Sequence, residues 1–486
     1  MQSNSKIEEL KKKLPNPVFE SIDELKKHSS NCFYINKYLP EAVYYAESDE
    51  EIIEVVNFCI KNKMPLIPYG SGTSVEGHTA AINGGICLNL SKMKKIIELN
   101  LIDGYVVVQA GIPYNELNEY LASYGFHFPV EAGFGASIGG MVSTNASGAG
   151  ATDSGSMAKN IMGCNLISYK DGMATKIQLG TKSIKSSAGY HLLDLIAGSE
   201  GTLGVISDVC LKIRKNFTHH KTICCQFNEI KQAIDFVISL KGLIQFRRVE
   251  LLDCLQTEAC VTYSKITYLY KNKNTIIIEL AGNEAVIEEE LKLINRQLNL
   301  MNIENIKIFD DKKSAEQIWM MRKNACPAAI QFINPQKKAM ATDISVPLSK
   351  LNESIHACYQ HMKEMGIIAP LVAHVGDGNF HFTLLVNPTD QTELEKAKTF
   401  NQRIIEESLK VGGTCTGEHG IGIGKMPYLE LEHENSMFLM SRIKESFDPL
   451  NIFNPGKLFD LKKHLCHSLE VDNNSLTIAN RRFCYF

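Results

Sequence analysis

The segment that most constrains this chain is a predicted β-hairpin centred on Asp377 and Gly378. Asp-Gly between two apolar runs is the strongest short-range signal for a two-residue hairpin turn. A turn at this dipeptide pairs His374 with His381, so that both imidazoles face the same side of the hairpin. Directly opposed residues have Cβ atoms about 4.5–5.5 Å apart, which lets two imidazoles bind one metal ion. The sequence therefore predicts part of a metal site.

A second loop supplies a carboxylate. Residues 413–422 are rich in glycine, which lets the backbone bring Glu418 and His419 into a crowded site. Two histidines and one carboxylate leave open coordination positions, so a substrate can reach the metal. The alternative is that His374 and His381 are ordinary half-buried strand residues, but their symmetric placement favours the metal site.

The composition narrows the class of protein. At 486 residues the chain is long enough for two or three domains. Its net charge of -3 and its lack of a long basic run disfavour nucleic acid as a partner. The 14 cysteines include no CxxC pair, which favours a reducing compartment over a zinc ribbon or a disulfide framework.

The sequence predicts neither a secretory signal nor a membrane span. Residues 1–15 mix lysine with glutamate and have no apolar core, and no run of about 18 apolar residues follows. We therefore expect a soluble cytoplasmic protein. Peripheral contact with the inner membrane is the alternative, because a respiratory partner could recruit the protein without a spanning segment.

The first part of the chain has an α+β pattern. Residues 48–60 have helical spacing, and Ser48 with Glu51 forms a capping box at their start. Pro113 opens a further helix. Strands are predicted at residues 65–69, 85–90, 105–110 and 205–213.

The middle of the chain has a different pattern. Predicted strands lie at residues 222–227, 246–252, 275–280 and 306–310, and predicted helices at 230–240 and 284–298. This βαββαβ order indicates a ferredoxin-like sheet with helices on one face, forming a separate cap. The turn-rich stretch 448–457 is expected to fold back onto the first part, and the tail beyond Lys463 to be frayed.

Glycine-rich loops indicate a nucleotide cofactor. Residues 68–75 leave a strand and present successive backbone amides and hydroxyls, as a loop around a diphosphate does. A tight turn is the alternative for this loop alone. Neither this loop nor residues 133–138 has the GxGxxG spacing, and the P-loop pattern is absent too, which disfavours an ordinary NAD fold. Several Gly/Ser segments in one α+β domain instead favour an extended dinucleotide lying across the fold.

Taken together, these motifs identify a family. The chain resembles the flavin-linked D-2-hydroxy-acid dehydrogenases with the PCMH-type (vanillyl-alcohol oxidase) FAD fold, and most of all the cytochrome-type D-lactate dehydrogenases. The resemblance covers about residues 35–460. The matching motifs are residues 69–74, 135–141, 145–148, 185–190, 198–206, 319–325, 374–381, 418–419 and 454–457.

The resemblance implies an α+β fold with a PCMH-type domain of two α+β subdomains, a ferredoxin-like cap, and a C-terminal segment that returns to the flavin domain. The implied divisions are an N-terminal extension (1–34), the FAD-binding domain (35–216), a substrate or cap domain with the hairpin (217–415), the C-terminal FAD-oxidase segment (416–462) and a tail (463–486).

The resemblance also implies an FAD site in which residues 70–74 hold the diphosphate, the next two motifs line the flavin and ribitol, and Ile206 lies near the adenine half. The implied FAD contacts are Gly70, Ser71, Gly72, Thr73, Ser74, Gly133, Ala136, Ser137, Gly140, Asn145, Ser147, Gly148, Glu200, Gly201, Ile206 and Asn454. His78 stands where relatives usually carry a small residue. We expect non-covalent FAD, because the flavin-linked histidine of covalent relatives lies nearer to Thr73.

The implied catalytic groups surround a divalent metal, Zn²⁺ or Mn²⁺, held by His374, His381 and Glu418. His419 would be the base. Arg322 would hold the substrate carboxylate, a task suited to a planar bidentate donor, and Lys338 is a second candidate for it.

The implied reaction is oxidation of D-lactate to pyruvate by hydride transfer to the flavin, with the electrons passed to cytochrome c, a quinone or an electron-transfer flavoprotein. The alternatives within the class are a D-2-hydroxyglutarate dehydrogenase and a glycolate oxidase subunit. A metal-dependent hydrolase, and a flavoprotein that binds FAD without turnover, are alternatives of other classes. The oligomeric state does not follow from the sequence, and a homodimer stays open.

Overall fold

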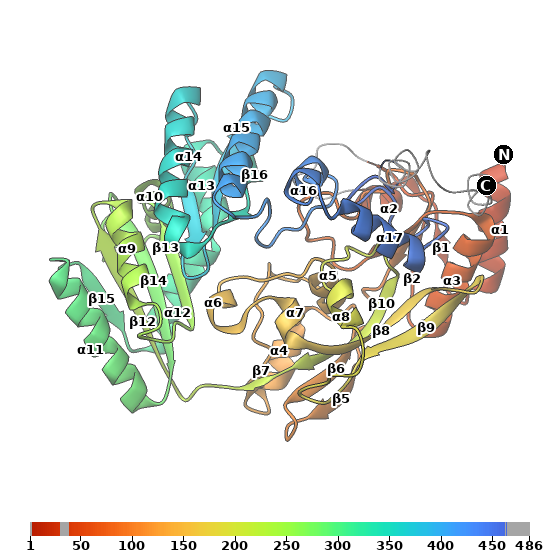
Figure 1. Ribbon diagram of the computed structural model, residues 1–486, viewed down its shortest axis with the longest axis horizontal. Coiled ribbons are helices and arrows are strands. Elements are labelled where there is room, and N and C mark those ends of the chain that lie inside the picture. The colour runs from red at the N-terminus through yellow and green to blue at the C-terminus, as the bar shows by residue number, and fades with distance from the viewer. Residues whose placement is uncertain (1, 30–37, 462, 464–486) are drawn as a thin grey trace, which may run out of the picture.

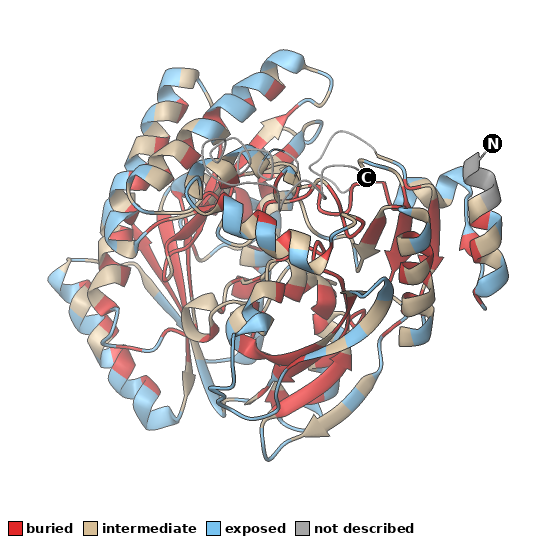
Figure 2. Ribbon diagram, turned by 45° about the vertical axis from the view of Figure 1, so that its right-hand side comes forward, coloured by how far each residue is buried: buried red, intermediate tan, exposed pale blue. Residues whose placement is uncertain are grey.

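The computed structural model describes residues 2–29, 38–461 and 463, so the predicted tail beyond Lys463 lies outside the described residues. Two groups of sheets lie side by side in Figure 1, the N-terminal one in red to yellow and the other in green to cyan. The buried residues of Figure 2 follow the strands of both groups.

The N-terminal group contains a mainly parallel sheet and an antiparallel sheet. The first has the order β1-β2-β4-β3 and the second β5-β6-β10-β8-β9, and a short pair, β7-β11, follows. The strands are β1 (Val18–Phe19), β2 (Ala42–Tyr45), β3 (Leu66–Tyr69), β4 (Ile86–Asn89), β5 (Ile96–Asn100), β6 (Tyr105–Gln109), β7 (Phe126–His127), β8 (Ile161–Lys170), β9 (Met173–Gly180), β10 (Val205–Lys212) and β11 (Arg214–Lys215). One hydrophobic core joins the two larger sheets.

Eight helices are described in this group: α1 (Gln2–Lys13), α2 (Ile22–Lys27), α3 (Asp49–Asn62), α4 (Tyr114–Ala122), α5 (Ile138–Ser143), α6 (Ala151–Ser154), α7 (Met157–Asn160) and α8 (Leu192–Ile196). The predicted capping of α3 is confirmed, because the Ser48 side chain accepts a hydrogen bond from the Glu51 amide. The predicted N-terminal extension joins this core through α1, whose Ile7 and Leu10 are buried in it.

The second group is built on one large sheet. Its strands are β12 (His219–Phe227), β13 (Arg248–Leu252), β14 (Asn274–Gly282), β15 (Ile306–Phe309), β16 (Lys338–Ala341), β17 (Ile344–Ser345), β18 (Leu371–His374) and β19 (Asn379–Val386). The order β15-β12-β14-β13 is that of the predicted ferredoxin-like sheet. The hairpin β18-β19 continues the same sheet beyond β13, so the predicted metal ligands stand on its extension.

The two predicted helices, α9 and α11, lie on one face of this sheet as expected, whereas α10 and α12 cover the other face, which was not predicted. Successive strand residues point to opposite faces, so Ile223 packs against α9 and α11 whereas Cys224 packs against α10 and α12. The unpredicted α10 buries Gln256 and Thr257 beside apolar residues, so no apolar stripe marks it in the sequence. The helices of this group are α9 (Ile230–Leu240), α10 (Cys254–Ser264), α11 (Glu284–Leu300), α12 (Lys312–Lys323), α13 (Ala325–Ile333), η1 (Leu348–Lys350), α14 (Leu351–Met365) and α15 (Gln391–Lys410).

The C-terminal segment returns to the N-terminal group, as predicted. Helices α16 (Met426–Glu432) and α17 (Met437–Phe447) carry the chain back, in blue in Figure 1. The Leu66 amide donates to the Ile452 carbonyl and the Asn454 amide donates to the Leu66 carbonyl, both at 2.7 Å. Phe453 is thereby buried in the first core.

The hairpin register differs from the prediction by two residues. His374 pairs with Asn379, and His381 pairs with Val372, so the histidines are diagonal rather than directly opposed. The amides of Asp377 and Gly378 both donate to the His374 carbonyl, which makes a longer turn. A Cβ at Gly378 would overlap the Val346 carbonyl, so tertiary packing sets this turn. Because the side-chain period of a strand is two, the histidines still share one face.

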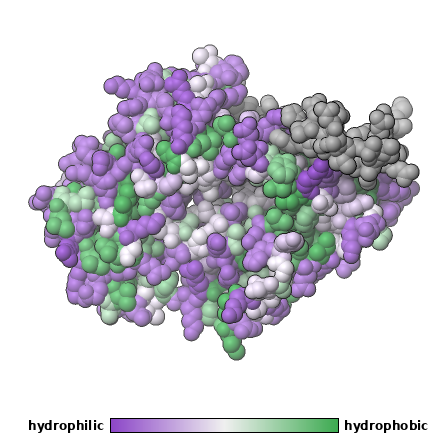
Figure 3. Space-filling model, in the orientation of Figure 1, coloured by the Kyte–Doolittle hydropathy of each residue, from purple (hydrophilic) through white to green (hydrophobic). Residues whose placement is uncertain are grey.

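None of the helices within the described ranges is long and apolar enough to cross a bilayer. On the face seen in Figure 3, hydrophobic side chains form separate small groups among hydrophilic ones.

Candidate active site

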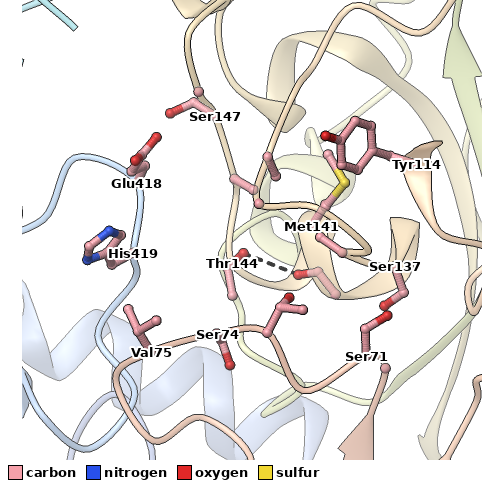
Figure 4. Close-up of a pocket in the computed structure, with 18 of the residues that line it drawn as sticks. Ser71, Ser74, Val75, Tyr114, Ser137, Met141, Thr144, Ser147, Glu418 and His419 are labelled. Carbon is pink, nitrogen blue, oxygen red and sulfur yellow. Dashed lines mark hydrogen bonds between the residues drawn. The ribbon is translucent and has the colours of Figure 1, made fainter. Parts of the chain in front are cut away.

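A cavity of about 570 Å³ is lined by residues of both groups of sheets. This volume is within the range of about 300–1,000 Å³ typical of small-molecule sites. The N-terminal group contributes the glycine-rich loops, and the second group and the C-terminal segment contribute His374, His381, Glu418 and His419. In Figure 4, Glu418 and His419 lie across the cavity from Met141 and Thr144.

The structure brings nearly all predicted FAD residues to this cavity. Asn145 is the exception, and its side chain instead accepts a hydrogen bond from the Ala158 amide at 3.0 Å. A Cβ at Gly148 would overlap the Glu131 carbonyl, so only glycine fits there. The buried Ser137 hydroxyl has no hydrogen-bond partner among the described residues. An unpartnered buried hydroxyl in a glycine-lined cradle fits a phosphate-bearing cofactor.

The three predicted metal ligands lie together. Glu418 Oε1 is 3.5 Å from His374 Nε2 and 3.3 Å from His381 Nε2, and one atom from each residue fits within a 4.8 Å cluster. The other ring nitrogens are already used: His381 Nδ1 donates to the Thr342 carbonyl at 2.9 Å, and His374 Nδ1 lies 2.6 Å from Glu250 Oε1. Both Nε2 lone pairs are thus directed to one point, as a metal requires.

A buried carboxylate, Asp343, holds the loop that carries Glu418 and His419. Its Oδ2 accepts hydrogen bonds from the amides of Gly417, Glu418 and His419 at 2.9, 3.1 and 3.0 Å. The buried Lys425 ammonium lies 3.3 Å from the same oxygen. Burial opposes ionisation of Asp343, but the Lys425 ammonium and the hydrogen bond from the Thr416 hydroxyl outweigh it and hold its pKa well below the usual value. The loop is therefore fixed by three successive amides around one oxygen.

His419 occupies the position expected of a base. Its ring stacks on His381, with centroids 5.2 Å apart, and its Nδ1 has no hydrogen-bond partner among the described residues. Burial lowers the pKa of His419 to about 4, although Asp343 opposes the shift. The imidazole is therefore neutral near pH 7 and able to accept a proton.

Arg322 and Lys338 occupy different environments. Arg322 lines the cavity, and its Nε and Nη2 atoms lie 2.7 and 2.6 Å from Glu250 Oε2. Lys338 is exposed on β16 and is not among the described residues that line the cavity. Two further cations line it: Lys323 and Arg248, which pairs with Glu279.

Two predicted cofactor contacts also join the halves of the site. Glu200 accepts hydrogen bonds from the amides of Ile421 and Gly422 at 2.6 and 2.8 Å, just after Glu418 and His419. The Asn454 side-chain amide donates to the carbonyls of His78 and Glu200. His78 itself is buried in the cavity wall, with its Nε2 atom 3.2 Å from Glu200 Oε1.

Sequence reasoning missed the acids and the lysine behind the first layer: Glu250, Asp343 and Lys425. Glu250 lies between Val249 and Leu251 in β13, and an acid between apolar strand residues is a signal, because a buried charge needs a partner. Asp343 follows Thr342 and gives no such signal.

Comparison with known proteins identifies the family. A family model of the FAD binding domain matches residues 40–178, and one of the C-terminal domain of FAD linked oxidases matches residues 218–458. A relative named "D-lactate dehydrogenase [cytochrome], mitochondrial" from Arabidopsis thaliana is 36% identical over 95% of this chain and 80% of its own length. This chain is a member of the FAD-linked oxidase family.

Other members have similar names and folds. A probable mitochondrial D-lactate dehydrogenase from Danio rerio is 32% identical over 87% of this chain and 85% of its own length. The structure of 4-ethylphenol oxidase from Gulosibacter chungangensis has a TM-score of 0.74, with 15% identity, over 94% of this chain and 97% of that one. The predicted family and PCMH-type fold are confirmed. Membership of the FAD-linked oxidase family excludes the alternative that this chain is a metal-dependent hydrolase.

Proposed function

We propose that this FAD-linked oxidase oxidises D-lactate to pyruvate at the cavity between its two groups of sheets. The observation that carries the proposal is that the glycine-rich loops of the FAD-binding part and the cluster His374, His381, Glu418 and His419 line one cavity. Relatives at 32–36% identity over most of the chain are named D-lactate dehydrogenases.

The residues present fit both groups that the proposal needs. The loop at residues 70–74 and the Ser137 and Gly148 region would hold FAD, and His374, His381 and Glu418 would hold Zn²⁺ or Mn²⁺. When bound, FAD would accept the hydride from C2 and the metal would polarise the substrate hydroxyl.

The protein's own residues then supply binding and proton transfer. Arg322 has Nε and Nη2 on Glu250, which leaves Nη1 and the second N–H of Nη2 as donors for the substrate carboxylate. His419, neutral at pH 7 and held by Asp343, takes the hydroxyl proton on its imidazole as the C2–H bond breaks. The hydroxyl carbon becomes the carbonyl of pyruvate, with one proton on His419 and one hydride transferred.

The electrons pass from the flavin to a second acceptor. We propose that this acceptor is a cytochrome, since the Arabidopsis, Kluyveromyces lactis and Saccharomyces cerevisiae relatives carry that word in their names. Quinone and electron-transfer flavoprotein are the other acceptors to test. These relatives are also named mitochondrial, so the cytoplasmic location of this chain stays a prediction.

The deciding experiment is an anaerobic stopped-flow scan of flavin absorbance with D-lactate, L-lactate, glycolate and D-2-hydroxyglutarate. Fast bleaching by D-lactate alone supports the proposal. Faster bleaching by glycolate would instead favour the activity named for the Bacillus subtilis glycolate oxidase subunit GlcD, which is 27% identical over 87% of this chain. Bleaching by none of the four would contradict the whole reaction class.

His419→Gln tests the base. A general base typically contributes about 10²–10⁴-fold in rate, so turnover with D-lactate should fall by this factor while FAD content is unchanged. His356→Gln, at an exposed position on α14, is the matched control and should retain wild-type turnover. A His419→Gln protein with near-wild-type turnover would exclude His419 as the base.

A further inference from the structure

Glu250 is a buried acid on β13 that contacts two residues of the site, His374 and Arg322. Its side chain is fully buried, and Oε1 lies 2.6 Å from Nδ1 of the proposed metal ligand His374. Its Oε2 accepts from Nε of Arg322 at 2.7 Å and lies 2.6 Å from Nη2. One carboxylate therefore joins the cavity arginine to a metal ligand.

This contact fixes which nitrogen of His374 is free. A carboxylate at Nδ1 holds the proton there, so the lone pair of Nε2 is directed to Glu418 and the metal position. A hydrogen-bonded carboxylate also makes the imidazole a stronger donor to a metal.

Arg322 fixes the position of Glu250. Two nitrogens of its guanidinium lie 2.7 and 2.6 Å from Oε2 of this fully buried carboxylate. The two-point contact with a planar guanidinium also fixes the plane of the carboxylate. Without Arg322, Glu250 would lose both its counter-charge and its orientation toward His374.

We propose that Arg322 and Glu250 are positioning residues of the metal site, acting on the metal through His374 in addition to any contact of Arg322 with substrate. The inference rests on the proposed function, since it assumes that His374, His381 and Glu418 hold a divalent ion. It gives Glu250 the role of orienting His374, and it gives Arg322 the second role of orienting Glu250. Substitution of Arg322 should therefore change metal affinity even without substrate.

The same sheet offers a matched control. Arg248 on β13 pairs with Glu279 on β14 through Nε at 2.5 Å and Nη2 at 3.0 Å, and it also lines the cavity. This second arginine–glutamate pair has no hydrogen bond to the three proposed metal ligands in the part of the chain that the structure describes. It has the same chemistry and similar burial, but among the described residues it makes no hydrogen bond to His374.

The test measures Zn²⁺ and Mn²⁺ affinity of FAD-loaded protein, without substrate, by competition with a chromogenic chelator. Variants are Glu250→Gln and Arg322→Lys, with Glu279→Gln and Arg248→Lys as controls. Loss of an outer contact to a ligating histidine typically weakens metal binding about 10–100-fold. We expect Glu250→Gln to lie in this range, Arg322→Lys to lose about threefold or more, and both controls to stay within about twofold.

FAD content and the thermal midpoint of each metal-free variant separate positioning from general destabilisation. Arg322→Lys with wild-type metal affinity overturns the proposal and leaves the substrate role of Arg322 untouched. Equal loss of affinity in the Arg248 and Glu279 controls also overturns it, because the effect would then follow from any cavity ion pair. Wild-type protein that binds neither metal would overturn the metal part of the proposed function and this inference together, whereas flavin bleaching by D-lactate would still test the reaction.

Discussion

Asp343→Asn should destabilise the protein strongly, because one buried oxygen accepts the hydrogen bonds that hold the loop at residues 416–419. Asp343 Oδ2 accepts from three successive amides and from the Thr416 hydroxyl, the latter at 2.6 Å. The other oxygen, Oδ1, accepts from the Asn379 side-chain amide at 2.8 Å. If the substituted side chain turns its carbonyl toward the loop, its own NH₂ group meets the Asn379 donor.

The magnitude follows from two losses. A buried donor left without an acceptor costs about 1–3 kcal/mol. Lys425, 2% exposed, would lose its counter-charge, and removing one partner of a buried ion pair costs about 3–5 kcal/mol. Because these effects share atoms and do not add, we expect the free energy of unfolding to fall by about 3–5 kcal/mol.

The assay is urea unfolding followed by tryptophan fluorescence. Trp319 is the single tryptophan of the chain, and it is buried against the sheet that carries the Asp343 loop, so its signal reports this part of the protein. The control is Asp390→Asn. Asp390 caps α15 by accepting from two amides, and asparagine caps helices equally well, so the cost there should be below about 0.5 kcal/mol.

The pH dependence provides an independent check. The pKa of Asp343 in the folded state is below its unfolded value, so its contribution is complete above the unfolded pKa of about 3.9 and is lost as pH falls toward the folded pKa. The difference between wild type and Asp343→Asn should thus be constant from pH 5 to 8. A folded variant that loses less than about 1 kcal/mol would refute the reasoning from the buried ion pair.

Three further predictions concern separate parts of the molecule. Asp253, buried at the start of α10, has a pKa raised by burial to about 6, so its ionisation destabilises the fold as pH rises from about 4 to 6. Measured by urea unfolding, the stability of Asp253→Asn relative to wild type should therefore increase by about 1–3 kcal/mol between pH 4 and pH 7. A difference that stays constant over this range would contradict the prediction. Gly148→Ala should lower the free energy of unfolding of the FAD-free protein by about 1–3 kcal/mol, because the added Cβ overlaps the Glu131 carbonyl. Gly133→Ala, with open space around the added carbon, should lower it by less than about 0.5 kcal/mol. Equal losses in the two variants would rule out this steric account. Dialysis against a chelator should abolish D-lactate turnover while flavin absorbance is retained, and Zn²⁺ or Mn²⁺ should restore it; full activity after chelation would exclude a metal role.

The sequence predicted those features that depend on local patterns. The capping of α3 by Ser48 needs only residues within one turn, and the βαββαβ order needs only the period of each segment. The helix α10 was missed because its buried side includes Gln256 and Thr257, whose burial depends on partners elsewhere in the fold, such as the Ala325 carbonyl for Gln256.

The grouping of His374, His381 and Glu418 could be predicted although the hairpin register was wrong. A shift of two residues in an antiparallel pair keeps every side chain on its face, and only a shift of one would have separated His374 from His381. The turn itself was set by contacts at Gly376 and Gly378 with residues far away in the sequence, which a short-range turn signal does not contain. The local sequence therefore determines which face of the hairpin the two histidines occupy, whereas tertiary contacts determine which residues pair across the strands.

The partners of Glu250 and Asp343 could not be predicted, because each of their contacts joins distant segments. His374 and Glu250 are 124 residues apart, and Glu418 and Asp343 are 75 apart. In an isolated strand, Glu250 would be expected to face solvent; it is buried only because Arg322 and His374 neutralise and orient its carboxylate. The ligands follow from residue type and spacing, but the charges that fix their geometry become visible only once the sheet is assembled. Under the proposed metal role, a sequence that kept His374, His381 and Glu418 but replaced Glu250 is therefore expected to retain the motif and to bind the ion less well.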